Sequence, residues 1–271
     1  GSAANTAAGI ASLGGRTAFV GRVKDDQLGD VFSHDLRAAG VAFDTPVAMY
    51  GPPTARSLVL VTPDAQRTMN TYLGACVELG PEDVDPAHVA DAEITYLEGY
   101  LWDREEAKAA FRKAAKAAEA AGRKVAFTLS DPFCVERWRH EFLELIDGHV
   151  HVLFANEAEI LSLYETADFD EALAKVRGHC EVAVVTRSER GSVLLADGDT
   201  HYVPAEPVEH VVDTTGAGDL YAAGVLHGLV TGEELPACGR LGAICAAEVI
   251  SHFGARPETS LKELVAATLA P

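Results

Sequence analysis

Short apolar runs alternate with longer amphipathic stretches along most of the chain. Apolar, β-rich runs occupy residues 18–23, 94–99, 124–130, 151–156 and 181–186. Helical patterns lie between them, the clearest at residues 104–122, where alanines accompany acidic and basic residues spaced to pair along one face. Repeated strand–helix–strand units predict an α/β fold with a doubly wound, mostly parallel sheet flanked by helices.

Residues 41–72 break this rhythm. They hold short strand-like runs around a turn at Pro52 and Pro53, with no helical pattern between the runs. Such a segment predicts a small antiparallel β lid at about 41–72, attached to a single domain that spans residues 1–271. A lid over a cleft and a plain edge extension are both compatible with this spacing.

The chain begins with GSAANTAAGIASLGG, which has the pattern of a helix. Because an α/β domain normally opens with a strand, we expect an N-terminal strand to be missing before Gly1.

The charge of the chain limits the classes of molecule that it is expected to bind. Its 22 Lys and Arg residues stand against 41 Asp and Glu residues, which gives a net charge of -19. Most of such a surface repels a phosphate backbone, so we expect no nucleic-acid partner. An anionic substrate would need backbone N–H donors or a metal ion to bind against this field.

Cysteine spacing and hydropathy indicate in which cellular compartment the protein is expected. The five cysteines form no CxxC pair, which fits neither a zinc site nor a disulfide framework. No apolar run approaches the length of a membrane span, and the first residues lack a signal-peptide pattern. We therefore expect a cytoplasmic protein with free thiols and no membrane association.

Residues 209–232, EHVVDTTGAGDLYAAGVLHGLVTG, carry the candidate chemistry. Gly216 and Gly218 leave the backbone open where a helix begins, and N–H groups at a helix start bind anionic oxygens. Asp219 follows in the first helical turn, where a base for phosphoryl transfer would stand. A tight turn followed by a capping Asp is equally compatible with these residues. There is no GxxxxGK[ST] motif and no third glycine of a dinucleotide site.

DTTGAGD matches the C-terminal signature of the ribokinase-like carbohydrate and nucleoside kinases, and further motifs follow in the order of that family. GSAANTAAGIASLGG resembles its first glycine-rich motif, VGRVKDDQLGD the next strand and turn, and NEAE its NxxE motif. TRSERGSVLL resembles its nucleotide-binding strand and turn, and SHFGARP the segment beside the adenine pocket. The resemblance spans nearly the whole chain and implies an ATP-dependent small-molecule kinase.

The resemblance also implies a role for each matching residue. Asp219 would be the general base, with Gly216, Ala217 and Gly218 as the anion hole. Gly1 and Asn5 would bind the substrate. The cofactors would be ATP and Mg²⁺, with Glu159 acting on the metal through water. The residues implied to bind or organise the nucleotide are Asn156, Glu159, Thr186, Ser188, Gly191 and Gly254.

The chain departs from the family pattern at two places. Ser188 stands where many relatives carry Gly, so contacts to the nucleotide differ there. The expected missing strand would also remove an Asp that binds two substrate hydroxyls in the family.

Two features favour adenosine as the substrate. FTLSDPF resembles an adenosine-kinase strand after which Phe133 would stack on the purine. The run TPDAQRTMNTYLGA resembles the lid return of the nucleoside kinases, with Arg67 as a phosphate contact. A core aromatic and a solvated hairpin charge are equally compatible with these two residues.

The leading hypothesis is therefore phosphorylation of the 5'-hydroxyl of adenosine. The alternatives are a sugar kinase acting on fructose, ribose or a keto-deoxy sugar acid, and a non-catalytic nucleotide sensor on the same fold. The resemblance raises two further expectations, a homodimer that pairs through the lid and a monovalent cation near the anion hole.

Overall fold

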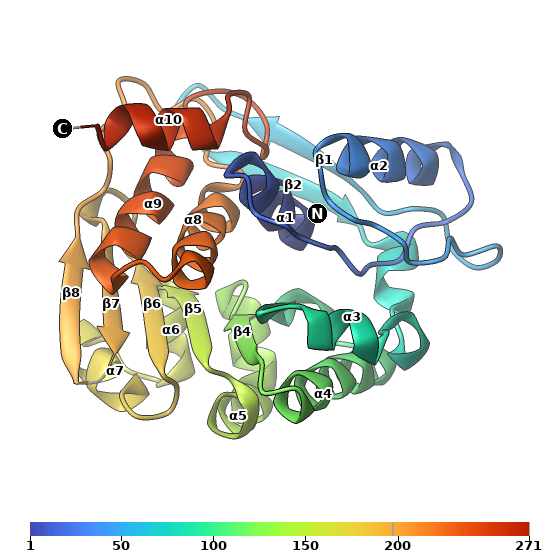
Figure 1. Cartoon of the computed structure of the whole chain (residues 1–271), viewed down its shortest axis with the longest axis horizontal. Helices are drawn as coiled ribbons and strands as arrows, with labels where there is room; N and C mark the ends of the chain where they lie inside the picture. The colour runs from blue at the N-terminus through green and yellow to red at the C-terminus, as the bar shows by residue number, and fades with distance from the viewer. Residues whose placement is uncertain (197, 271) are drawn as a thin grey trace. The chain divides into compact units, whose positions relative to one another are not determined.

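The computed structural model describes residues 1–196 and 198–270, which form two compact units. Unit 1 comprises Gly1–Leu79 and Ala205–Pro271, and unit 2 comprises Gly80–Pro204. Both are labelled by element in Figure 1. The joining of these units into a single domain stays a prediction.

Unit 2 is built on a mixed sheet of six strands in the order β3-β4-β5-β6-β7-β8. Its four parallel strands are β3 (Ile94–Glu98), β4 (Lys124–Thr128), β5 (Val152–Asn156) and β6 (Val182–Thr186). β7 (Ser192–Ala196) and β8 (Asp199–Val203) continue the sheet antiparallel. All four parallel strands lie within apolar runs that predicted them, and the mostly parallel sheet is confirmed.

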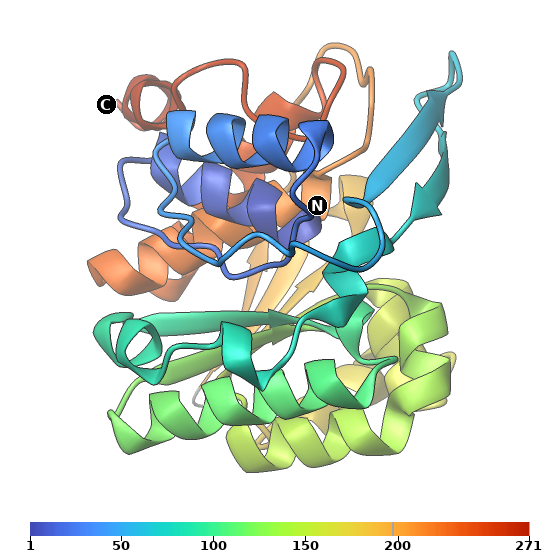
Figure 2. The same cartoon turned by 90° about the vertical axis from the view of Figure 1, so that its right-hand side faces the viewer.

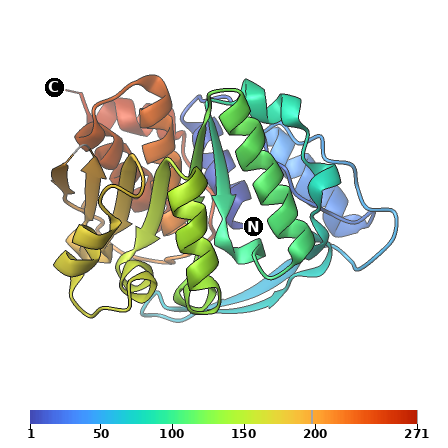
Figure 3. The ribbon, with the colours of Figure 1, turned by 90° about the horizontal axis from the view of Figure 1, so that it is seen from below.

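Helices cover this sheet through apolar faces. They are α3 (Pro86–Asp91), α4 (Glu105–Ala120), α5 (Pro132–His149), α6 (Glu157–Leu163) and α7 (Phe169–Val176). α4 packs on β3 and β4, and α6 packs on β5 and β6. Figure 3 shows α4 and α5 lying across the same face of the sheet. Trp102, Phe111, Phe127 and Phe142 meet edge to face or tilted in the core beneath them.

Unit 1 is mainly helical. Its helices are α1 (Ser2–Ser12), α2 (Gln27–Ala38), α8 (Ala217–Thr231), α9 (Leu235–Val249) and α10 (Leu261–Thr268). α1 forms where the first residues predicted a helix, and it packs on α8. α8 and α9 approach closely because glycines face each other: a Cβ on Gly224 would lie 2.6 Å from the Leu241 carbonyl oxygen, and one on Gly242 would lie 2.8 Å from that of Tyr221.

A two-stranded antiparallel hairpin completes unit 1 (Figure 2). It consists of β1 (Arg56–Val61) and β2 (Arg67–Tyr72), paired from Arg56 opposite Tyr72 to Val61 opposite Arg67. The antiparallel patch predicted within residues 41–72 therefore forms in the second half of that segment.

The strand predicted at residues 18–23 does not form. Only two isolated parallel bridges occur there, between Ala18 and Ala42 and between Lys24 and Ala48. Between these bridges the neighbouring chain contains Pro46, which has no N–H to donate. The Gly21 N–H instead meets the Thr45 hydroxyl at 3.4 Å, so a continuous ladder is interrupted.

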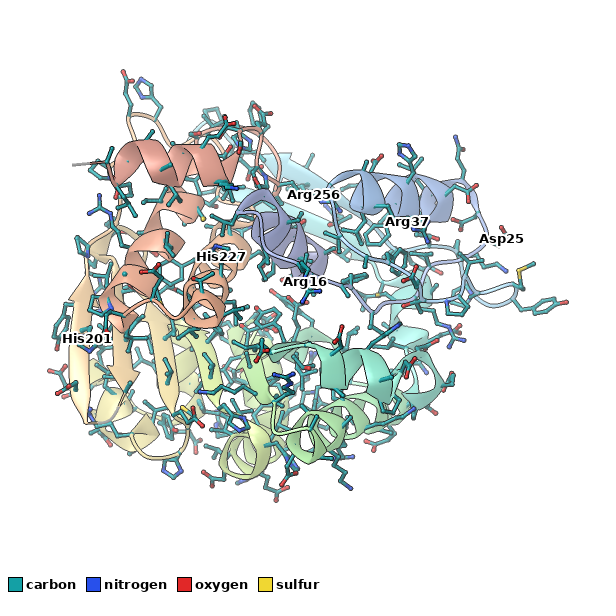
Figure 4. All side chains as sticks on the ribbon, in the orientation of Figure 1. Arg16, Asp25, Arg37, His201, His227 and Arg256 are labelled. Carbon is teal, nitrogen blue, oxygen red and sulfur yellow. The ribbon has the colours of Figure 1, made fainter. Side chains whose placement is uncertain are left out.

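Aromatic packing holds this irregular region against α2. Phe19, Phe32 and Phe43 lie with ring centroids 5.5 to 5.7 Å apart. Arg37, labelled on α2 in Figure 4, donates from Nε and Nη2 to the Phe43 carbonyl oxygen at 3.0 and 2.6 Å.

The helices in the described part of the chain are all too short or too polar for a bilayer crossing.

Candidate active site

Asp219 lies in the first turn of α8, and two side chains of α1 hold its carboxylate. The Ser2 hydroxyl donates to Oδ1 at 2.7 Å, and the Asn5 amide donates to Oδ2 at 2.9 Å. Ser2 and Asn5 are three residues apart on one helix, so both side chains reach the same neighbour. The structure therefore brings the predicted substrate residue Asn5 into contact with the predicted base.

The environment of Asp219 makes it a better proton acceptor than a free carboxylate. Burial raises its pKa because the charged form loses hydration. The hydrogen bonds from Asn5 and Ser2 and the positive charge of Arg67 lower it, without cancelling the effect of burial. A general base gains efficiency as its pKa moves toward the working pH.

The loop before Asp219 presents backbone N–H groups. Gly216 is the N-cap of α8 with φ +83°, and Ala217 donates only a long bond of 3.4 Å to the Thr214 carbonyl oxygen. Across residues 1–196 and 198–270, the N–H groups of Gly216, Gly218 and Asp219 make no hydrogen bond to a backbone acceptor outside α8. These donors, at the positive end of a 15-residue helix, suit an anionic oxygen.

Asp213 fixes the shape of this loop. It is buried and accepts hydrogen bonds from the Thr215 N–H at 2.9 Å, the Thr215 hydroxyl at 2.6 Å and the Gly254 N–H at 3.1 Å. These bonds outweigh burial and hold the pKa of Asp213 below its usual value. Gly254, predicted to lie beside the nucleotide, is thereby tied to the anion loop.

Arg67 reaches the same loop from β2. Its Nη1 donates to the Thr214 hydroxyl at 2.7 Å, and its charge lowers the pKa values of Asp213 and Asp219. The hairpin therefore brings a cation to the anion loop within unit 1. Gly1, the other predicted substrate residue, is the N-cap of α1, where its carbonyl oxygen accepts from the Asn5 N–H at 3.0 Å.

In unit 2, Asn156 and Glu159 form a reciprocal cap at the start of α6. The Asn156 Oδ1 accepts from the Glu159 N–H, and the Glu159 carboxylate accepts from the Asn156 N–H at 2.9 Å and from its side-chain amide at 2.6 Å. Glu159 is 4% exposed, and burial raises its pKa to about 7, with Asp131 adding to the rise and the Asn156 N–H opposing it.

The donor set of unit 2 suits magnesium that keeps its own waters. The described residues contain no group of three or more His, Cys, Asp or Glu side chains that could hold a metal ion directly. Both Glu159 oxygens already accept from Asn156. Mg²⁺ commonly retains waters and binds nucleotide phosphates, so Asn156 and Glu159 fit as residues that orient those waters.

The turn between β6 and β7 holds the other predicted nucleotide residues of unit 2. The Arg187 N–H donates to the Gly191 carbonyl oxygen at 2.7 Å, and Gly191 closes the turn with φ +80°. Ser188 has φ +52°, a left-handed conformation that glycine adopts at lower cost. Thr186 and Ser188 line a cavity of about 410 Å³ together with Asn156.

Phe133 is the second residue of α5 and is 73% exposed. It is therefore not a core aromatic, and its ring is free to stack on a planar ligand.

Two contacts were not predicted from the sequence. Ser2 could have been found from its i,i+3 spacing to Asn5, whereas the pairing of Arg187 with Glu157 joins residues 30 positions apart and leaves no local signal.

Residues 1–261 match the model of the pfkB family of carbohydrate kinases. The chain belongs to this family. A crystal structure of adenosine kinase from Sinorhizobium meliloti is 55% identical, with a TM-score of 0.97 over 99% of this chain and 82% of that one. A probable sugar kinase from Rhizobium etli is 53% identical, with a TM-score of 0.96 over 98% of this chain and 81% of that one.

A more distant relative of this pfkB family member is the 5-dehydro-2-deoxygluconokinase of Shouchella clausii, 29% identical over 98% of this chain and 85% of the relative. The fold is ribokinase-like. Kinases of this family use ATP with Mg²⁺ and transfer a phosphoryl group to a hydroxyl acceptor. The chain is thus a carbohydrate or nucleoside kinase, and the role of each residue above stays a prediction.

Proposed function

We propose that this pfkB family kinase transfers the γ-phosphoryl group of ATP to the 5'-hydroxyl of adenosine. The observation that carries the proposal is the position of Asp219, whose carboxylate is held by Ser2 and Asn5 directly after a loop with free N–H groups. A base and an anion-binding loop in one helical turn are what hydroxyl phosphorylation requires.

Asp219 would accept the proton of the attacking hydroxyl, and Asn5 would orient the carboxylate and the substrate. The N–H groups of Gly216, Ala217 and Gly218 would stabilise negative charge on the transferring phosphoryl oxygens. Arg67, already bonded to Thr214 in that loop, would add a positive charge. Its hairpin would also exclude water, which otherwise competes as the acceptor.

The residues proposed to bind the nucleotide are Thr186, Ser188, Gly191 and Gly254. Asn156 and Glu159 would orient the water shell of Mg²⁺. When bound, this ion neutralises phosphate charge. We also propose that a monovalent cation binds near the anion loop, because Asp213 places a buried carboxylate there.

The choice of adenosine rests on Phe133 and on similarity. An exposed ring at the start of α5 provides stacking area for a purine, which is worth about 1 to 3 kcal/mol and serves no purpose for a bare sugar. The 55% identity to the S. meliloti adenosine kinase supports the same choice.

The second candidate is a sugar kinase. The R. etli protein described as a probable sugar kinase is similar to almost the same degree, and the S. clausii relative phosphorylates a keto-deoxy sugar acid by its name. A non-catalytic sensor is the third candidate. The raised pKa of Asp219 argues against it, because a protein that only binds phosphate gains nothing from a basic carboxylate beside it.

The test is ADP release with Mg-ATP and a panel of adenosine, other nucleosides, fructose, ribose and keto-deoxy acids. We expect adenosine to give the highest kcat/KM. Substituting Phe133→Leu should raise the KM for adenosine about tenfold and leave sugar turnover unchanged. Faster turnover of a sugar would replace adenosine by the second candidate, and ATP binding without any turnover would favour the sensor.

We further propose that two copies pair through the hairpin. Leu58 and Leu60 are two positions apart, so both side chains lie on the same face of β1, where they are 68% and 63% exposed. The hairpin has free edges on both sides in the described structure, and such edges pair readily. Light scattering should give a dimer that Leu58→Lys converts to a monomer.

A further inference from the structure

A cluster of charged side chains in unit 2 is not used by the proposed function. We define the Arg187 cluster as Arg187, Arg190, Glu157 and Phe169. Arg187 Nη2 donates to Glu157 Oε1 at 3.0 Å, and Arg190 Nη2 donates to Glu157 Oε2. The guanidinium carbon of Arg187 lies 3.9 Å from the centre of the Phe169 ring.

The cluster is a local positive charge in an acidic protein. Two guanidinium groups and one carboxylate sum to +1, in a chain whose net charge is -19. Because most of the surface repels anions, a fixed cation of this kind has a large influence on where an anionic ligand binds.

The cluster borders the cavity that holds predicted nucleotide residues. Arg187 and Glu157 line the same 410 Å³ space as Asn156, Thr186 and Ser188. Thr186, Arg187 and Ser188 are consecutive, and all three line this cavity, so a phosphate bound in it can contact both the turn and Arg187. The cavity is large enough for part of a nucleotide.

Arg187 is held in place but still has donors to offer. Stacking on Phe169 and the bond to Glu157 fix the guanidinium plane, and its side chain is 21% exposed. In the part of the chain that the structure describes, Nη1 has no hydrogen-bond acceptor, and Nε is buried without one. A guanidinium group oriented in advance binds phosphate oxygens through paired N–H groups and loses little side-chain freedom in doing so.

We infer that the Arg187 cluster is a polyphosphate subsite: Arg187 binds phosphate oxygens of the nucleoside di- or triphosphate, and Glu157 holds Arg187 and Arg190 while limiting their combined charge. The inference rests on the proposed function for the identity of the nucleotide. It implies that the site distinguishes ATP and ADP, which carry adjoining phosphates, from AMP and adenosine, which do not.

Two substitutions should have opposite effects. Arg187→Gln removes the cation, so the Kd for Mg-ADP and for a non-hydrolysable Mg-ATP analogue should rise about tenfold or more. Glu157→Gln raises the charge of the cluster from +1 to +2, so both Kd values should fall about threefold and depend more steeply on salt. If the cluster only stabilised the fold, both variants would lose affinity or neither would change.

The measurement is calorimetric titration of the full chain with Mg-ADP, the ATP analogue, AMP, adenosine and inorganic phosphate at two salt concentrations. Arg137→Gln is the matched control, because Arg137 is an exposed arginine of unit 2 that pairs with Asp103 at 3.3 Å. Arg187→Lys keeps the positive charge but lacks the paired N–H groups of the guanidinium, so it should lose an intermediate amount of affinity for Mg-ADP. Thermal melting confirms that each variant is folded.

An Arg187→Gln protein that binds Mg-ADP as tightly as the wild type would overturn the inference, as would equal losses for AMP and adenosine. A wild-type chain that binds no ADP overturns it as well. The two proposals fail separately: if no acceptor is phosphorylated but Arg187→Gln still weakens ADP binding, the kinase proposal is wrong and the subsite stands.

Discussion

Two turns, one in each unit, place a residue with left-handed backbone next to a proposed phosphate contact. In the anion loop of unit 1 this residue is Gly216 with φ +83°, and in the β6–β7 turn of unit 2 it is Ser188 with φ +52°. A Cβ on Gly216 would lie 2.8 Å from the Ala255 carbonyl oxygen, whereas Ser188 carries its Cβ without displacing the turn. A left-handed φ alone therefore does not require glycine in these two turns. Glycine is required at Gly216 because the neighbouring backbone leaves no room for a Cβ.

The proposed function places the chemical step at Asp219 beside the anion loop, and Asp219→Asn tests this most strongly. Without a base, we expect kcat to fall at least ~100-fold while the Kd for ATP stays within about twofold. The measurement is steady-state turnover beside calorimetric ATP binding. Asp170→Asn is the control, because Asp170 is an exposed acid in the first turn of α7. Near-normal turnover of Asp219→Asn would refute the assignment of the base.

Gly216→Ala tests whether the neighbouring backbone decides the requirement for glycine. The left-handed φ costs about 1 kcal/mol for alanine, and the contact with Ala255 adds about 1 to 2 kcal/mol by forcing a backbone shift. We expect a corresponding loss of unfolding free energy and a fall in kcat, because the loop proposed to bind phosphoryl oxygens moves.

The control for Gly216→Ala is Gly232→Ala at the other end of α8. Gly232 has φ +80° but no atom within 4 Å of an added Cβ, so only the backbone cost of about 1 kcal/mol should appear in chemical denaturation. Equal losses for the two variants would show that φ, and not the Ala255 contact, decides.

Ser188→Gly should have a smaller effect of the opposite sign. It removes the backbone strain of a non-glycine residue at φ +52°, although glycine also gains freedom in the unfolded chain, so we expect a net gain below about 1 kcal/mol. Ser188→Ala keeps the strain and loses only the hydroxyl. Urea denaturation of both variants separates strain from hydrogen bonding, and a destabilised Ser188→Gly protein would contradict the account of this turn.

The smallest expected effect is a pH dependence near the anion loop. His252 lies 3.4 Å from the Glu248 carboxylate and 3.8 Å from that of Glu258. Burial alone would lower the pKa of His252, but the Phe253 carbonyl oxygen and these two carboxylates outweigh it and raise the pKa above its usual 6.5. Glu248 also accepts from the Glu258 and Thr259 N–H groups, so it anchors the segment that follows α9.

Because the folded-state pKa of His252 is above the unfolded one, its stabilising effect is complete below about pH 6.5 and is lost as the pH rises through the folded-state value. His252→Gln should therefore lose a few tenths of a kcal/mol relative to wild type at acidic pH and about nothing at alkaline pH. Urea denaturation at about pH 6 and about pH 8.5 measures the two gaps. A gap that does not change with pH would rule out the ion pair as its cause.

Structure could be predicted from the sequence where local pattern determines it. The runs that became β3 to β6 are mainly apolar, and the central residues of β4, β5 and β6 are buried, as expected of parallel strands covered on both faces. The run at residues 18–23 has a similar pattern but lacks a continuous partner, because Pro46 interrupts the neighbouring chain, and pairing of that kind is a tertiary property. The turn that leads into α8 could be predicted because its residues are consecutive. The contact of Ser2 with Asp219 spans 217 positions, and only the folded chain shows it.

The glycine contacts between α8 and α9 fix the position of Asp219, the proposed base, from a distance. α8 has no room to tilt, since Gly242 lies against the Tyr221 carbonyl oxygen two residues beyond Asp219. We expect a single methyl group added at Gly242 to displace α8, and Asp219 with it. In the proposed mechanism such a variant loses turnover, because Asp219 no longer reaches the acceptor hydroxyl.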